Sequence, residues 1–435
     1  MIYFVGEKSL MDEYPLSSVE ECINYFKDKK SIALDTETQG RNPHSKKILS
    51  LQLGDEERQF VIDCRSTNIL KFKDLLESKK ILMHNAKFDY KFLKHAGIVC
   101  EDIWDTMLAE CVLYCGYEKY GYSLANLTER YCNVTLSKDT RGDFFKLTSE
   151  PFTAEQIRYA GTDVLYLHRI AKEQHTKLAT LNLLYAANLE FQAVKALADI
   201  EYNGVYLNAD MWLENTSKYV KNLDEIVKEL DQIVLTDSIL KEHYRALGIL
   251  NLFDYEERQL DINYSSPKQV LTLLNRLELF PLNTNAQELI KLKDKHPIIN
   301  VLDKYREYAK VISTYGESFL SNINKVTNRV HTDFWQVLNT YRISSNNPNL
   351  QNIPADKTFR NCFEPRPGYS WVSIDYSSQE LRLMADYSDE EGFIDVLNRG
   401  EDLHCFAGSM MFKRPVTKQD KDLRNKAKTI NFGKP

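Results

Sequence analysis

The sequence predicts a multidomain protein of mixed class, with an α/β part followed by a mainly helical part and then an α+β part. Short apolar runs alternate with helical patterns over residues 1–180, and a mostly helical pattern fills residues 181–330. Residues typical of strands return over 331–435, before further helical patterns. At 435 residues the chain has room for two or three domains. We expect the domains to follow these three ranges.

The first range contains short apolar runs that predict strands and longer patterns that predict helices. Its capping box, Thr153-Ala-Glu-Gln156, predicts a helix that begins there and runs to about His175. The expected strands are Ser31–Leu34, Ile48–Leu53, Phe60–Ile62 and Ile81–Met83, and the expected helices lie around Ile69–Glu77, Phe88–His95 and Asp105–Tyr114.

The later ranges carry the helical and the α+β patterns. Four apolar residues recur at the spacing of one helix face: Val220, Leu223, Val227 and Leu230. Strands are then expected at Val330–Val337 and at Ser370–Ile374, which leads directly into Asp375.

Composition excludes several classes of protein. The chain is 43% hydrophobic and 27% charged, and its eight cysteines form no CxxC pair. No apolar run approaches the roughly 18 residues of a membrane span, and the N-terminus has no signal-peptide layout. We expect a cytoplasmic protein with reduced thiols, neither secreted nor associated with a membrane.

The net charge of −6 is unusual for a simple nucleic-acid binder, which is often basic. An enzyme with several metal-binding carboxylates can be acidic and still grip DNA through a local basic surface. The segment Pro415–Pro435 fits this description, although a solvated charged helix is the alternative. Its basic residues are Lys418, Lys421, Arg424, Lys426, Lys428 and Lys434, set against Asp420 and Asp422.

Asp35 and Glu37 follow the apolar run Ser31–Leu34. Side chains alternate along a strand, so both carboxylates project from one side. Two acids so placed suit a hard divalent cation, which prefers oxygen ligands. An exposed edge strand with a pair of acids is the structural alternative for this motif alone.

Two further segments carry acidic residues on predicted helices. Asp89 falls in the first turn of a helix that we expect Asn85 to cap, where an acid also simply suits the helix dipole. Tyr159 and Asp163, at i and i+4, share one helix face and place a phenol beside a carboxylate.

These segments, in this order and with Asp105-Thr-Met-Leu between the second and third, resemble the three motifs of the DEDD 3′–5′ exonucleases with tyrosine in the third motif. The resemblance implies an RNase H-like domain over residues 1–180. It also implies removal of nucleotides from single-stranded 3′ ends with release of 5′-monophosphates.

The resemblance assigns a role to each site residue. Asp35, Glu37 and Asp163 hold one metal ion, Asp35 also reaches a second ion, and Asp89 helps to position that second ion. Tyr159 orients the attacking water. The implied cofactor is Mg²⁺, with Mn²⁺ as the alternative, at two ions per active site.

The segment Asn339–Pro354, which ends in Pro348-Asn-Leu-Gln-Asn-Ile-Pro354, resembles a long and specific segment of family A DNA polymerases. Arg342 falls where that family places an arginine near the primer–template and the incoming nucleotide. Tyr341 departs from the family, in which many members have glycine at this position.

Trp371–Arg382 resembles polymerase motif A. By this resemblance Asp375 binds both catalytic metals, and the backbone carbonyl of Tyr376 assists. Glu380 falls where the family uses a glutamate to exclude a ribose 2′-hydroxyl. Ser378 stands where the common family pattern has glutamine.

The last segment resembles motif B, the fingers helix, through Arg424, Lys428 and Phe432. Helical spacing puts these three side chains on one face, where the two cations bind the triphosphate and the ring packs against base and sugar. His404 matches a family histidine near the incoming phosphates. A generic amphipathic helix is the alternative for motif B.

Together the resemblances imply a DNA polymerase I-like chain of family A, in the phage-type layout without a 5′ nuclease domain. Residues 181–330 form the connecting helix and thumb, and residues 331–435 form a partial palm and fingers truncated within motif B. The implied partners are primer–template DNA, deoxynucleoside triphosphates and a separate C-terminal polymerase fragment. The implied role is proofreading in DNA replication in a bacterial or phage-infected cell, with nucleotidyl transfer only when the polymerase is completed.

Two rival hypotheses remain at this point. The first is a dedicated exonuclease in which a polymerase remnant grips DNA. The second is a non-catalytic DNA-binding polymerase subunit, which the intact exonuclease carboxylates disfavour.

Overall fold

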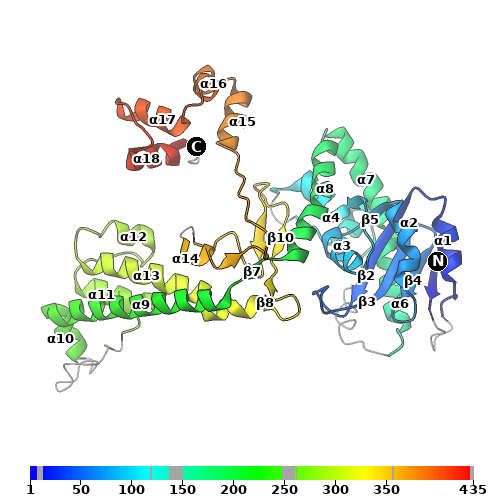
Figure 1. Ribbon diagram of the computed structural model, residues 1–435, viewed down its shortest axis with the longest axis horizontal. Helices are drawn as coiled ribbons and strands as arrows, with labels where there is room; N and C mark the ends of the chain where they lie inside the picture. The colour runs from blue at the N-terminus through cyan, green and yellow to red at the C-terminus, as the bar shows by residue number, and fades with distance from the viewer. Residues whose placement is uncertain are drawn as a thin grey trace. The chain divides into compact units, whose positions relative to one another are not determined.

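The computed structural model describes residues 1–6, 13–117, 120–136, 150–246, 260, 262–354 and 357–431 (Figure 1). The chain divides into two compact units, Met1–Arg366 and Pro367–Pro435, called here unit 1 and unit 2. Within the described ranges, no helix is both long and apolar enough to cross a membrane.

A six-stranded mixed sheet opens unit 1, with strand order β1-β4-β3-β2-β5-β6. All four predicted strands are confirmed, and the first and last strands in chain order are additional to them. The central strand β2 pairs antiparallel with β3 and parallel with β5. The bounds are β1 Ile2–Val5, β2 Ser31–Thr38, β3 Ile48–Gly54, β4 Gln59–Asp63, β5 Lys80–Met83 and β6 Asp102–Asp105.

The burial of β2 changes along its length. Ile32, Ala33 and Leu34 are fully buried, because helices cover both faces of the sheet there. From Asp35 onward, half-buried and buried residues alternate. The strand therefore delivers two acids at its carboxyl end, the place where ligands bind in α/β sheets.

The helices of this domain pack around the sheet, and α6 lies against β2, β3 and β4. The capping box is confirmed: Gln156 N donates to Thr153 Oγ1 at 3.2 Å, and Thr153 N donates to Gln156 Oε1 at 2.9 Å. The bounds are α1 Val19–Phe26, η1 Ile69–Phe72, α2 Lys73–Glu77, α3 Ala86–His95, α4 Thr106–Tyr114, α5 Leu124–Cys132, α6 Ala154–Leu165, α7 Leu167–Thr180 and α8 Leu184–Asn203.

The single helix predicted from Thr153 to His175 is wrong, because the chain breaks at Tyr166 into α6 and α7. The two helices have different partners. α6 packs on the sheet, whereas α7 packs mainly on α4 and α5. One straight helix could not contact both surfaces. The break depends on packing partners that are distant in the sequence, so the local residues do not predict it.

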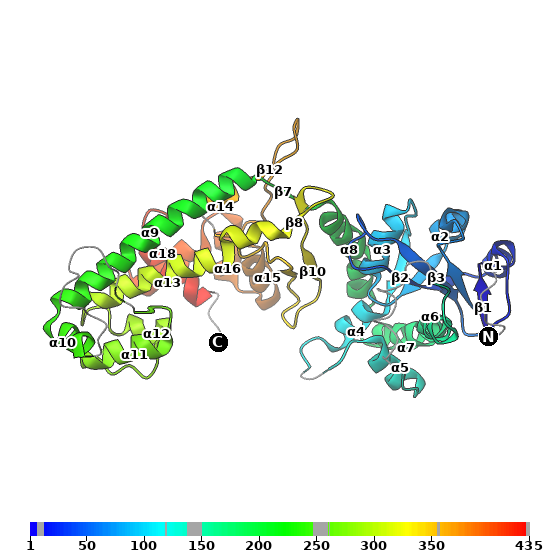
Figure 2. The same ribbon diagram turned by 90° about the horizontal axis from the view of Figure 1, so that it is seen from below.

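The helical middle of unit 1 is built on two long helices, α9 and α13, which lie side by side (Figures 1 and 2). Leu223, Val227 and Leu230 of the predicted apolar face pack into the core here, whereas Val220 is 39% exposed. The bounds are α9 Ala209–Thr236, α10 Ser238–Ala246, α11 Pro267–Arg276, α12 Ala286–Ile290 and α13 Ile298–Tyr315.

Short strands and the fully buried Trp212 join this helical part to the rest of unit 1. The Trp212 ring stacks on Phe319 at a centroid distance of 4.7 Å. The strand predicted over Val330–Val337 is split between β9 and β10. The bounds are β7 Tyr206–Leu207, η3 Glu317–Asn322, β8 Ile323–Asn324, β9 Arg329–Val330, β10 Asp333–Trp335, β11 Ser344–Asn346, α14 Lys357–Arg360 and β12 Phe363–Glu364.

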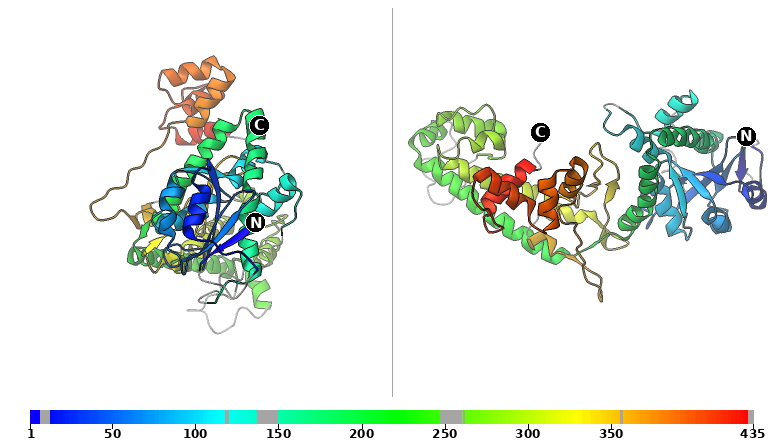
Figure 3. Two further views of the ribbon diagram at one scale, coloured as in Figure 1. Left: turned by 90° about the vertical axis from the view of Figure 1, so that its right-hand side faces the viewer. Right: turned by 90° about the horizontal axis from the view of Figure 1, so that it is seen from above.

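Unit 2 is a cluster of four helices around Leu381, Val396 and Leu403, drawn orange to red in Figure 3. The helices are α15 Gln379–Ser388, α16 Glu391–Asn398, α17 Leu403–Phe412 and α18 Lys421–Asn431. The strand predicted at Ser370–Ile374 is wrong. The segment is extended but pairs with no strand among the described residues, and Ile374 is 85% exposed. An apolar run becomes a strand only when a neighbouring strand satisfies its backbone.

Candidate active site

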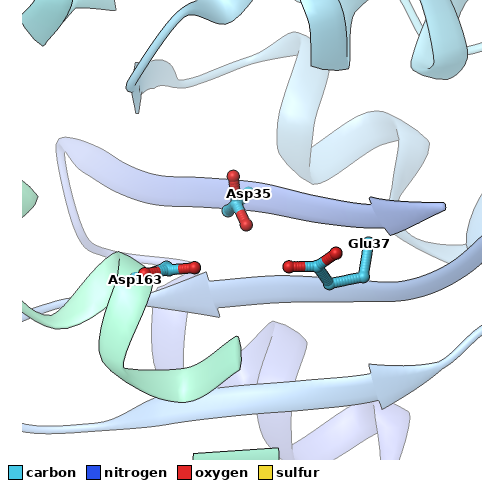
Figure 4. A group of neighbouring side chains, drawn as sticks. All are labelled: Asp35, Glu37 and Asp163. Carbon is cyan, nitrogen blue, oxygen red and sulfur yellow. The ribbon is translucent and has the colours of Figure 1, made fainter. Parts of the chain in front are cut away.

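Asp35, Glu37 and Asp163 converge where α6 crosses β2 (Figure 4). One carboxylate oxygen from each residue lies within 4.8 Å of the other two. Asp35 and Glu37 come from the same strand, and Asp163 comes from the facing helix, so that the carboxylates of Glu37 and Asp163 point towards each other. All three side chains are half-buried.

This donor set fits a divalent metal ion. Three carboxylates at this separation repel one another strongly unless a cation neutralises them or protons bind. Carboxylate oxygens are the ligands that Mg²⁺ and Mn²⁺ prefer. The half-burial leaves access for a substrate and weakens screening by water.

Asp89 lies beside this group and is buried, at 2% exposure. Thr36, between Asp35 and Glu37 on β2, donates from Oγ1 to Asp89 Oδ1 at 2.6 Å. Burial, and then the negative charge of Asp35, raise the pKa of the Asp89 carboxyl well above its ordinary value. Asp89 is therefore electrostatically linked to Asp35, although it is outside the three-acid group.

Tyr159 is four residues before Asp163 on α6. Its half-buried ring packs against a small apolar cluster under α6 that includes Phe4, Leu49 and Phe152. The phenol is thereby held on the helix that supplies the third carboxylate.

The cap of α3 differs from the prediction. Asn85 is the N-cap residue, but its φ is 62° and its side chain makes no capping hydrogen bond. Asp105 caps the helix instead, accepting from Asn85 N at 3.1 Å and Ala86 N at 2.8 Å. The same carboxylate accepts from Met107 N at 2.8 Å and Leu108 N at 3.2 Å. One buried acid thus caps both α3 and α4.

From the sequence, Asp105 is named only as part of a motif, and its capping role is not predicted. An aspartate directly before an apolar helical pattern is a recognisable N-cap, which could have predicted its bonds to α4. Its bonds to α3 arise because β5 and β6 are neighbours in the sheet. Burial raises the pKa of Asp105, while the four backbone N–H groups oppose this shift.

A second buried acid, Glu201 of α8, fixes the other side of α3. Lys91 Nζ lies 2.6 Å from Glu201 Oε2, and Lys87 pairs with the same carboxylate. The backbone N–H of Phe334 in β10 also donates to Glu201, at 2.6 Å. The helix that carries Asp89 is therefore tied to α8 and to β10.

The polymerase-like segment places Arg342 on the surface, next to a strained turn. Tyr341 has a φ of 57°, a conformation that glycine adopts easily and that costs other residues roughly 1–2 kcal/mol. The turn is closed by a hydrogen bond from Tyr341 N to Leu338 O at 2.8 Å. The chain thus keeps a glycine-like turn where the family commonly has glycine.

Motif A is exposed in unit 2. Asp375, Tyr376 and Glu380 all lie on the surface. Among the described residues, the only group of three acids within ligand distance is the one on β2 and α6. Asp375 therefore belongs to no such three-acid group among the described residues.

The motif B residues lie on α18, which packs on α17. Arg424 Nη2 is 2.7 Å from Asp402 Oδ2, and Asn431 Nδ2 lies 3.0 Å from His404 Nδ1. Burial alone raises the pKa of Asp402, but hydrogen bonds from Arg424 and the backbone outweigh it and lower the pKa. Burial lowers the pKa of His404. Lys428 is exposed on α18, and Phe432 lies outside the described residues.

Comparisons with known proteins agree with both halves of this description. The family described as 3′-5′ exonuclease matches residues 14–179, and DNA polymerase family A matches residues 242–434. DNA polymerase I of Borreliella burgdorferi is 31% identical over 95% of this chain and 46% of its own length. DNA polymerase I of Aquifex aeolicus is 27% identical over 99% of this chain and 71% of its own length.

A solved structure shares the fold. The POL domain of Pol1 from M. smegmatis, in complex with DNA primer-template and dNTP, has a TM-score of 0.74 at 22% identity. The match covers 99% of this chain and 70% of that chain.

The fold and the carboxylate site define a protein with a 3′–5′ exonuclease domain joined to a polymerase-type region. Residues 242–434 belong to family A of the DNA polymerases, as their motifs predicted. The chain spans about half the length of the Borreliella burgdorferi relative, 46%.

The double cap at Asp105 generates a stability prediction. We expect Asp105→Asn to lower the free energy of unfolding by about 3 kcal/mol, because an amide cannot accept from all four buried N–H groups. Asp102→Asn is the matched control, since Asp102 is 60% exposed on the same strand and pairs with Lys80. It should cost less than about 1 kcal/mol. Guanidinium unfolding followed by circular dichroism measures both, and equal losses would contradict the assignment.

Proposed function

We propose that the chain is a metal-dependent 3′→5′ exonuclease that proofreads as part of a family A DNA polymerase. The observation that carries the proposal is the convergence of Asp35, Glu37 and Asp163 within 4.8 Å on a domain of the matching family. The buried Asp89 beside Asp35 and the Tyr159 phenol on α6 support it further.

The proposed chemistry is hydrolysis of the terminal phosphodiester of a single-stranded 3′ end. Two divalent ions, when bound, supply a hydroxide near neutral pH and stabilise charge on the leaving oxygen. Asp35, Glu37 and Asp163 provide the oxygen ligands, and Asp89 contributes at its edge of the site. The Tyr159 hydroxyl orients the attacking water by hydrogen bonding. Mg²⁺ is the proposed ion, with Mn²⁺ as a substitute, in the cytoplasm of a bacterial or phage-infected cell.

We further propose that the polymerase-like region binds primer–template DNA and deoxynucleoside triphosphates. Arg342 contacts the primer–template, Glu380 excludes the 2′-hydroxyl, and His404 lies near the phosphates. Arg424, Lys428 and Phe432 act from the fingers helix. The placement of His404 and Arg424 on adjoining helices supports a shared binding face.

Asp375 and the Tyr376 carbonyl are proposed to hold metal only after further strands complete the palm. The exposure of the segment before Asp375 supports this, because Val372 is 77% and Ile374 is 85% exposed. A separate C-terminal polymerase fragment is the proposed source of those strands. The rival function, a dedicated exonuclease whose polymerase-like region only grips DNA, is favoured by the single three-acid site among the described residues.

The exonuclease proposal predicts the effect of removing two ligands. Asp35→Ala with Glu37→Ala should reduce degradation of a 3′-labelled single strand in Mg²⁺ by at least about 10³-fold, because the metal frame is lost. The fold should be retained, since both side chains are half-buried at a strand end. The Asp102→Asn variant should degrade DNA like the wild type. Undiminished cleavage in the double variant, or none by the wild type, would refute the proposal.

The exposed motif A predicts that the 435-residue chain alone does not extend a primer, because Asp375 is on the surface and belongs to no three-acid group among the described residues. Adding a family A fragment that begins after the fingers helix should restore synthesis, measured by template-directed incorporation in protein free of host polymerase. Incorporation by the chain alone would overturn the prediction. Failure of the fragment to restore synthesis would favour the dedicated exonuclease.

A further inference from the structure

Two polar residues of β3 lie directly across the sheet from the acids of the proposed metal site. In the β2–β3 register Gln52 is opposite Asp35, and Ser50 is opposite Glu37. Residues directly opposite in an antiparallel pair point to the same face, with Cβ atoms about 5 Å apart. Gln52 and Ser50 therefore share the face that carries the carboxylates.

Helix α6 covers this face over β3. Gly54, two residues beyond Gln52 and on the same face, is so close to α6 that an added Cβ would lie 2.7 Å from Val164 Cγ2. Val164 directly follows Asp163, so the helix that supplies the third carboxylate also covers Gln52. Both Gln52 and Ser50 are 0% exposed.

Gln52 is polar in a row that is otherwise apolar up to Asp35. Across the sheet the row runs from Phe4 to Val61, then to Gln52 and Asp35. Gln52 Nε2 donates to Ser50 Oγ at 2.6 Å, whereas its Oε1 is buried with no hydrogen-bond partner among the described residues. Burying an unpaired amide atom is unfavourable, and a methionine would fill similar space without that cost. The polar neighbour of Gln52 in its row is Asp35.

We propose that Gln52 is a positioning residue of the exonuclease site, whose amide donates a hydrogen bond to the Asp35 carboxylate while Ser50 anchors its other end. The inference rests on the proposed function of that site. A half-turn of the amide exchanges its nitrogen and oxygen, which have nearly the same shape. The Ser50 hydroxyl then donates to Oε1, and Nε2 is free to reach the acid, so both amide atoms are satisfied.

The proposed bond fixes the orientation of a metal ligand. A carboxylate that is held by a neutral donor binds a divalent ion without first losing its own rotational freedom. Partners of this kind typically change metal affinity or activity by about 10- to 100-fold when they are removed. A neutral amide achieves this without competing for the ion, whereas a lysine at the same place would repel it.

The test compares Gln52→Met with Val61→Ala, a control in the same row on the side away from Asp35. For Gln52→Met we expect the Mn²⁺ concentration for half-maximal cleavage to rise about 10-fold or more, with KM for the oligonucleotide nearly unchanged. Thermal stability should be kept, because the variant removes an unpaired buried group. Ser50→Ala should give a smaller shift in the same direction. Val61→Ala should lose stability but keep the wild-type Mn²⁺ dependence.

Calorimetry measures Mn²⁺ binding directly, with the Asp35→Ala, Glu37→Ala double variant as the reference that lacks two ligands. This measurement separates the inference from the proposed function. Wild-type protein that binds Mn²⁺ but cleaves no DNA would refute the exonuclease, and weaker Mn²⁺ binding by Gln52→Met would still support the positioning role. Wild-type Mn²⁺ affinity and cleavage in Gln52→Met would overturn the inference alone. Weak Mn²⁺ binding shared by Val61→Ala would also overturn it, since the effect would be one of packing. Wild-type protein that neither binds Mn²⁺ nor cleaves DNA would overturn both the proposed function and the role of Gln52.

Discussion

The mutual repulsion of three carboxylates within 4.8 Å of one another is the constraint on which the rest of the structure depends. Such a group is unfavourable in any folded protein unless a cation neutralises it or protons bind. The elements around it therefore hold the acids together against their own charge. The central strand fixes two of them in the sheet, and a capped helix packed on three strands fixes the third.

Buried acids elsewhere in unit 1 have protein partners that the structure identifies. Glu110 is fully buried, but Arg130 pairs with it at 2.9 Å and Tyr131 donates to it at 2.8 Å. Glu201 is met by Lys87 and Lys91. These carboxylates stabilise packing because each one forms an ion pair or a hydrogen bond with another residue of the protein. The acids on β2 and α6 lie within 4.8 Å of one another, an arrangement suited to binding an ion from outside the protein.

The sequence predicted the features that depend on residues close together in the chain. Apolar runs predicted β2 to β5, and the Thr153 capping box predicted the start of α6. The motif resemblance led us to expect Asp35, Glu37 and Asp163 in one site, and these three acids lie close together. The break at Tyr166 could not be predicted, because it depends on which surfaces α6 and α7 meet. The double cap by Asp105 depends on the pairing of β5 with β6. The missing strand before Asp375 depends on partner strands rather than on its own apolar residues.

Binding of a divalent cation by the three acids on β2 and α6 is the property on which the proposed chemistry depends. Anomalous diffraction from crystals of the chain soaked in Mn²⁺ tests it most directly. We expect a manganese peak bounded by Asp35, Glu37 and Asp163, which should be absent from crystals of the Asp163→Ala variant. An empty site at saturating Mn²⁺, with the three carboxylates still in place, would contradict it.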